Sequence, residues 1–142
     1  MQIDNAMALN EKLPPIKGIY YFSYACDATI LADDGTRSLD PELGGGMYKV
    51  SGARLCTYEG VTPSGYVIDE KWQANDGLVN TYSALVPIGA PSVDYNADSV
   101  TTGIWNVMPV MRGNHSTLQG GMTKALNGRI FFVDLLSMIN SL

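Results

Sequence analysis

Two residues of this 142-residue chain have the types and the setting for acid–base chemistry, Asp76 and His115. Asp76 lies in the stretch Trp72-Gln73-Ala74-Asn75-Asp76-Gly77-Leu78-Val79-Asn80-Thr81, and the glycine after it allows the chain to reverse sharply. His115 is the only histidine and lies in the polar loop 112–117. A carboxylate that orients a catalytic histidine needs a rigid, partly buried position. We expect Leu78 and Val79, which follow Gly77, to enter a buried region.

Both residues also have a simpler explanation. Asn-Asp-Gly is a strong turn signal by itself. A single histidine in a loop is more often solvated or structural than catalytic. The residue types alone therefore leave a structural turn and a catalytic pair both open.

Two apolar runs are the candidates for the strands that position these residues. Residues 16–25 are dense in aromatic and β-branched side chains with few charges, which is typical of a buried strand in a parallel sheet. Residues 103–111 are the second candidate, and Pro109 predicts an edge position or a bulge near the end of that strand. Parallel strands bring their carboxyl ends to one side of a sheet, where open α/β sheets build their sites. We therefore predict that the Asp76 carboxylate lies within hydrogen-bond reach of Nδ1 of His115.

The remaining segments indicate an α/β fold: a small, mostly parallel sheet with flanking helices and a long loop excursion, forming one domain over residues 1–142. Asp4 or Asn5 can cap a short helix over residues 4–13, which Pro14-Pro15 ends. The remaining expectations are a polar excursion away from the sheet at 26–46, a helix or a hairpin at 47–58, loops at 60–66 and 87–102, flexible glycines at 120–121 and a closing helix at 122–142.

Composition excludes several classes of function. A formal net charge of −5 argues against a sequence-independent grip on nucleic acid phosphates. No apolar stretch is long enough to span a bilayer, and Met1-Gln2-Ile3-Asp4 does not begin a signal peptide. Cys26 and Cys56 lack the Cys-x-x-Cys spacing, so a disulfide is possible but two free, buried thiols are the simpler interpretation, and cysteine does not decide the compartment.

The order of the candidate residues has a known counterpart. A carboxylate after one strand and a histidine just past the next is how an α/β-hydrolase chain ends, since its triad runs Ser, Asp, His. The chain resembles the C-terminal portion of bacterial triacylglycerol lipases of the Geobacillus and staphylococcal type. The resemblance rests on Tyr20-Tyr21-Phe22-Ser23-Tyr24-Ala25, Pro41-Glu42-Leu43-Gly44, the segment 69–81, Gly103-Ile104-Trp105-Asn106-Val107 and Asn114-His115. It implies that Asp76 and His115 are the triad residues of an ester hydrolase acting on lipids, and that the parent enzyme is secreted.

The chain departs from that family at two places. No Gly-x-Ser-x-Gly occurs in it, so we expect a fragment whose nucleophile and oxyanion hole lie on a missing N-terminal part. The family also has an aspartate before the histidine and a calcium-binding glutamate two residues after it, and Asn114 and Thr117 stand there instead. Calcium needs oxygen ligands, usually carboxylates. We therefore expect no metal or cofactor, although backbone carbonyls at 44–46 remain as possible ligands.

Three functions compete. The first is part of a lipase or carboxylesterase, with His115 as base and Asp76 as its orienter. The second is an inactive hydrolase remnant that pairs with another chain. The third is a metal hydrolase, for which the chain offers too few metal ligands because it has one histidine. For the isolated chain we expect no ester hydrolysis. We also expect a homo-oligomer, because the missing part leaves a strand edge and an apolar face uncovered.

Overall fold

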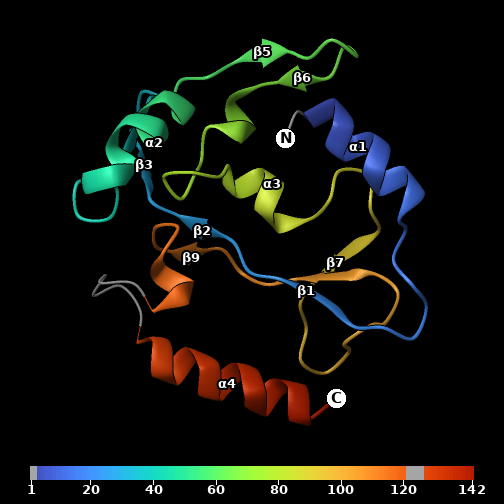
Figure 1. The fold of residues 1–142 in the computed structure, drawn as a ribbon. Helices are drawn as coiled ribbons and strands as arrows, with labels where there is room; N and C mark the ends of the chain where they lie inside the picture. The colour runs from blue at the N-terminus through green and yellow to red at the C-terminus, as the bar shows by residue number, and fades with distance from the viewer. Residues whose placement is uncertain (1–2, 121–126) are drawn as a thin grey trace.

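The computed structural model describes residues 3–120 and 127–142. Its central element is a parallel sheet of three short strands in the order β1-β8-β7, comprising Tyr21–Ser23, Trp105–Val107 and Ser92–Asp94 (Figure 1). The central strand, β8, pairs with β1 on one side and with β7 on the other. The predicted α/β class with a small parallel sheet and flanking helices is therefore confirmed.

The predicted strand at 16–25 is too long at its start. Ile16 and Ile19 are 62% and 45% exposed. They enclose a turn in which Gly18 has a φ of +82° and the Ile19 N–H donates to the Ile16 carbonyl. Extended pairing with β8 begins only after this turn, because a backbone that reverses cannot lie along a neighbouring strand.

The predicted excursion at 26–46 is wrong in its first residues, which continue the parallel pairing. Cys26–Asp27 form β2, parallel to β9 at Met111–Arg112. The Met111 N–H donates to the Ala25 carbonyl at 2.9 Å, and the Gly113 N–H to the Asp27 carbonyl at 3.1 Å. The chain leaves the sheet only after β2, and part of the excursion forms the antiparallel hairpin β3–β4, Thr29–Leu31 with Arg37–Leu39.

Two predicted loops also contain strands. Within 87–102, Ser92–Asp94 form β7 although all three residues are exposed, so they lack the apolar alternation that reveals a half-buried strand. A second antiparallel hairpin joins β5 at Gly60–Val61 to β6 at Val67–Ile68. Pro109 lies in the break between β8 and β9. The predicted edge position is wrong, because β8 is the central strand of its sheet.

The helices follow the sequence more closely. Helix α1 spans Ile3–Lys12. Asp4 is not its cap, because it lies inside the first turn and accepts hydrogen bonds from the N–H and hydroxyl of Ser64. The open choice at 47–58 resolves as a helix, since the 3₁₀ helix Gly46–Tyr48 leads into α2 at Lys49–Leu55. Two further 3₁₀ helices, Glu70–Trp72 and Thr117–Gln119, each make a single turn.

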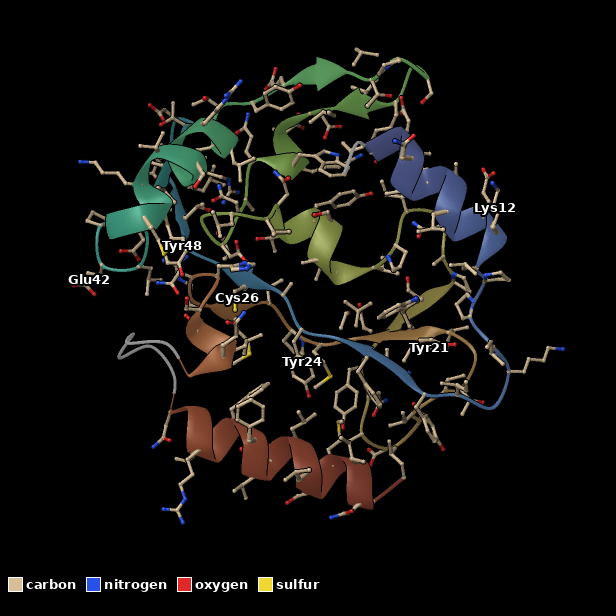
Figure 2. The ribbon with its side chains drawn as sticks, in the orientation of Figure 1. Lys12, Tyr21, Tyr24, Cys26, Glu42 and Tyr48 are labelled. Atoms are coloured by element: carbon tan, nitrogen blue, oxygen red, sulfur yellow. The ribbon has the colours of Figure 1, made fainter. Side chains whose placement is uncertain are left out.

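The closing helix, α4, spans Gly128–Asn140 and is capped by the side chain of Asn127. The part of the predicted helix at 122–126, and the predicted flexible Gly121, lie outside the described residues. Helix α3, Thr81–Leu85, lies on one side of the strands and α4 on the other (Figure 1). Tyr24 points from the end of β1 toward α4, where its ring meets Phe131 edge-on at 5.2 Å (Figure 2).

The core is small. Trp72 is 3% exposed and packs edge-on against Tyr66 and Tyr82, as expected for a packing residue. The other buried apolar residues are Ala25, Cys26, Ala28, Tyr48, Cys56 and Ile68. In the described part of the chain, the helices are all too short or too polar to cross a membrane.

Candidate active site

The Asp76 side chain is fixed by its own turn. Its Oδ1 accepts the N–H groups of Leu78 and Val79 at 2.9 and 2.8 Å, and the Asp76 N–H donates to the Val79 carbonyl at 3.0 Å. These bonds occupy one carboxylate oxygen and leave Oδ2 to face outward from the turn. The expectation that Leu78 and Val79 are buried is wrong: they are 44% and 37% exposed, because the turn points them toward solvent.

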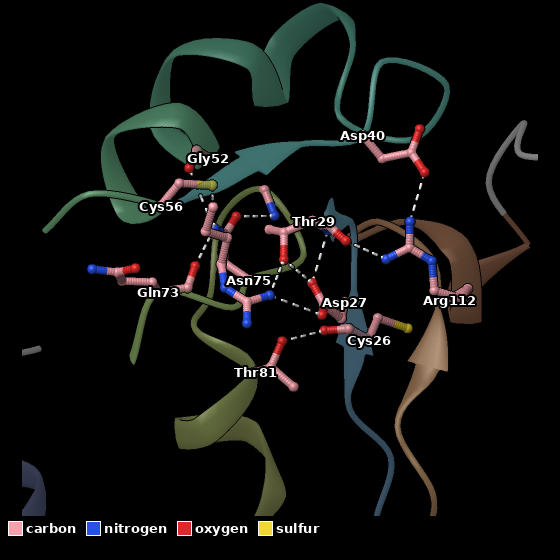
Figure 3. Close-up of polar contacts among 12 residues, drawn as sticks. Cys26, Asp27, Thr29, Asp40, Gly52, Cys56, Gln73, Asn75, Thr81 and Arg112 are labelled. Atoms are coloured by element: carbon pink, nitrogen blue, oxygen red, sulfur yellow. Dashed lines mark hydrogen bonds and ion pairs between the residues drawn. The ribbon is translucent and has the colours of Figure 1, made fainter. Parts of the chain in front are cut away.

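Asn75 anchors this turn to the rest of the molecule. Its side chain is fully buried; Nδ2 donates to the Gln73 and Gly52 carbonyls, and Oδ1 accepts the Gly77 N–H at 2.9 Å (Figure 3). Its backbone carbonyl accepts the N–H of Ala28, directly after β2, at 2.8 Å. The Asp76 turn is thus tied to the carboxyl end of that strand.

Gly77 is required by two independent constraints. Its φ of +101° disfavours any side chain, and a Cβ there would lie 2.6 Å from Cβ of Tyr48. Its carbonyl accepts the Ser51 hydroxyl at 2.6 Å, which joins the turn to α2. The turn therefore packs directly against the Gly46–Tyr48 segment.

The loop of His115 is held at several points. The Gly113 N–H donates to the Asp27 carbonyl, and the His115 N–H donates to the Asp76 carbonyl at 2.8 Å. The hydroxyls of Ser116 and Tyr48 share a hydrogen bond. This loop leaves β9 just where the Asp76 turn meets β2, so two adjacent parallel strands bring the two segments together.

The side chains of Asp76 and His115 meet as the sequence predicts. Nδ1 of His115 lies 2.9 Å from Oδ2 of Asp76, which confirms the predicted contact. The Asp76 side chain is 14% exposed and that of His115 is 37% exposed. If the ring carries its proton on Nδ1, that atom donates to the carboxylate and Nε2 is left as a proton acceptor.

Several residues that hold this pair were not found from the sequence. Tyr48 contacts the His115 loop through its hydroxyl, and the side chains of Asn75 and Asn114 contact main-chain N–H and carbonyl groups. Asparagine and tyrosine are common in loops, so their presence does not mark an anchoring role. Only the glycine of Asn-Asp-Gly is a local signal, and it indicates the turn.

A calcium ion does not fit the residues at this site. Asn114 uses its Oδ1 to accept the Ser116 N–H, and its Nδ2 donates to the Leu43 carbonyl. A cation needs oxygen acceptors where this chain places a donor. Within residues 3–120 and 127–142, no three His, Cys, Asp or Glu side chains lie together as metal ligands would.

Both cysteines are free and buried. Burial raises the pKa of the Cys26 thiol to about 11, and the nearby Asp76 charge adds to the effect. Burial also raises the pKa of Cys56. Neither thiol has the lowered pKa of a nucleophilic cysteine.

Comparison with known proteins finds structural relatives, whereas no family model matches the chain. EstA from Clostridium botulinum superposes with a TM-score of 0.82 at 25% identity, over 96% of this chain and 32% of that one. Staphylococcus hyicus lipase superposes with a TM-score of 0.74 at 25% identity, over 97% of this chain and 34% of the lipase. Lipase 1 from Pelosinus fermentans superposes with a TM-score of 0.70 at 30% identity, over 90% of this chain and 34% of the lipase. The chain thus spans about a third of the length of each.

Proposed function

Because this chain has part of the α/β-hydrolase fold of bacterial lipases, we propose that it is the histidine- and aspartate-bearing part of a serine ester hydrolase. The contact that supports this proposal is the 2.9 Å approach of Nδ1 of His115 to Oδ2 of Asp76. It lies at the carboxyl ends of two adjacent parallel strands, where sites of open α/β sheets are found.

The proposed chemistry gives each residue one role. Nε2 of His115 takes the proton of a serine hydroxyl as that oxygen attacks the ester carbonyl, and returns it to the leaving alcohol. Asp76 holds the ring in the Nδ1–H tautomer and stabilises the imidazolium that forms. The serine and the oxyanion hole belong to a segment outside this sequence, since no Gly-x-Ser-x-Gly occurs in it.

The substrate class we propose is an acyl ester with an apolar chain, of the triacylglycerol type. Two structural relatives are named as lipases. Leu78 and Val79, which follow Gly77 in the Asp76 turn, expose apolar side chains. An apolar rim suits an aliphatic acyl chain better than a charged substrate.

An inactive remnant that works by pairing with another chain is the second candidate. The missing nucleophile favours it for these 142 residues alone. A histidine base without a nucleophile has nothing to activate.

The test begins with the coding DNA upstream of the Met1 codon, read for an in-frame Gly-x-Ser-x-Gly. The product that spans both parts is assayed with short- and long-chain p-nitrophenyl esters beside its His115→Ala and Asp76→Asn variants. We expect His115→Ala to abolish turnover and Asp76→Asn to lower kcat about 10⁴-fold. Full turnover by His115→Ala would overturn the proposal, and the lack of any upstream serine motif would favour the remnant.

The isolated chain provides the complementary measurement. We expect no hydrolysis of these esters above background, because the nucleophile is absent. Turnover by the purified chain that disappears in His115→Ala would contradict this expectation, because the nucleophile would then be supplied without the missing part.

A further inference from the structure

The side chain of Asn114 joins the loop that carries His115 to a distant loop. It is 7% exposed. Its Nδ2 donates to the Leu43 carbonyl at 2.9 Å, across 71 positions of sequence. Its Oδ1 accepts the Ser116 N–H at 3.0 Å and the Thr117 hydroxyl at 3.3 Å. Both ends of the amide are therefore used, one within the His115 loop and one on the neighbouring loop.

Arg112 makes a second link, a charged one, between these two parts of the chain. The Arg112 guanidinium lies 2.6 Å from Oδ2 of Asp40, whose side chain is 18% exposed, and it also donates to the Thr29 carbonyl (Figure 3). The carbonyl of Asp40 accepts the Leu43 and Gly44 N–H groups. Arg112 and Asn114 thus connect the His115 loop to the Asp40 turn at two points.

These contacts hold the His115 loop and the Asp40 turn together, as a bound cation between two loops would. A divalent cation would draw carbonyl and carboxylate oxygens together. Here Leu43 offers such a carbonyl, but the group that faces it is an N–H donor. The sequence has no aspartate or glutamate between Asp98 and Asp134, so this loop supplies no carboxylate to a metal.

We propose that Asn114 is a positioning residue whose neutral amide holds His115 against Asp76 without a metal ion. Exchange of the Asn114 amide for a carboxylate removes the donor to Leu43 and sets two oxygens against each other, so the His115 loop moves away from the Asp40 turn. The catalytic meaning of this link rests on the proposed ester hydrolysis, but the link itself is a property of the isolated chain.

The test compares Asn114→Asp with a matched variant, Asn96→Asp, in the purified chain. The Asn96 side-chain oxygen accepts the Asp98 N–H in an exposed loop, a role that aspartate fills equally well. Long-range ¹⁵N NMR of the His115 ring reports whether its proton stays on Nδ1, and thermal unfolding reports the Tm. We expect Asn114→Asp to lose the fixed Nδ1–H tautomer and about 5 °C of Tm. Asn96→Asp should change neither quantity.

A second measurement uses the unaltered chain, so the test does not depend on the folding of a variant. Its Tm is measured in millimolar calcium and again in EDTA, and we expect the two values to agree. A Tm that calcium raises would overturn the metal-free link, as would an Asn114→Asp chain that keeps both the Nδ1–H tautomer and the Tm. Because neither measurement needs turnover, failure of the proposed ester hydrolysis would leave these results unchanged and would be recognised separately.

Discussion

At the scale of single residues, Asp76 matters because its two oxygens have different partners. Oδ1 accepts two backbone N–H groups and Oδ2 faces Nδ1 of His115. The turn alone explains the first set of bonds, whereas the second is the contact that the proposed chemistry requires. A substitution that keeps the turn and alters only the second contact separates a structural turn from a catalytic pair.

Asp76→Asn is that substitution. The new side-chain oxygen can still accept from Leu78 and Val79, while its NH₂ group then faces Nδ1 of His115 and needs an acceptor there. We expect the His115 ring proton to move to Nε2, as in other triads where this replacement gives the wrong tautomer. Long-range ¹⁵N NMR of the isolated chain measures the tautomer. A ring that keeps its proton on Nδ1 in the variant would contradict the pairing.

Gly77 allows a second residue-scale prediction with an internal control. Gly77→Ala combines a φ of +101° with a Cβ 2.6 Å from Tyr48, whereas Gly35→Ala meets a φ of +84° and nothing within 4 Å. We expect Gly77→Ala to lower the free energy of unfolding by about 3 kcal/mol and Gly35→Ala by about 1 kcal/mol. Urea denaturation measures both. Equal losses would show that Tyr48 moves aside and that the turn is not rigidly packed.

The Cys26 thiol predicts how stability depends on pH. Its pKa is about 11 in the folded chain against a usual value of 9.0. Between these values the unfolded chain releases the thiol proton and the folded chain keeps it, so stability falls as pH rises from about 9 to 11. We expect Cys26→Ala to have a shallower loss of stability over this range. Urea denaturation at several pH values measures the slope, and equal slopes in the two proteins would refute the assignment.

The sequence could predict the contact between Asp76 and His115 but not the residues that hold the two segments in place. The types of Asp76 and His115 and the order of the candidate strands made the pair possible, and the resemblance of their segments to bacterial lipases favoured it over a simple turn. Asn75 and Asn114 do not stand out, since each acts on carbonyls or N–H groups of the main chain, and one of those carbonyls lies 71 positions away. No side-chain pattern marks a partner that is a main-chain atom.

At the scale of elements, the short strands were the hardest to predict. The central sheet strands have three residues each, and their pairing depends on neighbours far along the chain. β7 is exposed along its whole length and so has no alternation to recognise. Helices α1 and α4 were found because apolar spacing, a stop at Pro14-Pro15 and the length of the run are local features.

The start of α4 provides a test at this scale. Oδ1 of Asn127 accepts the N–H groups of Arg129 and Ile130 at 3.1 and 3.3 Å. We expect Asn127→Ala to lower the free energy of unfolding by about 1 kcal/mol, because these N–H groups lose their cap. Asn127→Asp keeps an acceptor and should preserve stability. An alanine variant as stable as the aspartate variant in urea denaturation would show that the cap contributes little to this helix.

At the scale of the whole molecule, the chain leaves much apolar surface in contact with solvent. The outward side of α4 carries Ile130, Val133 and Leu136, which are 57%, 55% and 59% exposed. On α2, Val50 is 83% exposed, and Met47 just before the helix is 80% exposed. Large exposed apolar areas mark surfaces that bury against something else. This chain spans about a third of the length of its structural relatives, so we propose that the rest of an α/β-hydrolase fold would cover this surface.

When that remainder is absent, we predict that a second copy of the chain covers part of this surface. In the described sheet β1 pairs on one side with β8, and its other edge is open to a further strand. The exposed side of α4 offers a second surface, and its residues recur at helical spacing. Self-association should therefore grow with protein concentration.

Size-exclusion chromatography with light scattering measures this directly. We expect the mass to exceed that of the monomer at high concentration, and Val133→Lys with Leu136→Lys to reduce it, because two charges on the α4 surface oppose burial. Asp33→Lys makes the same two-unit change in charge at an exposed position in the turn between β3 and β4, outside α4, and should leave the mass unchanged. If both variants and the unaltered chain remain monomeric at high concentration, the apolar surface does not bind a second copy. If the mass falls only when a lysine replaces an edge residue such as Phe22, pairing runs through β1 rather than α4.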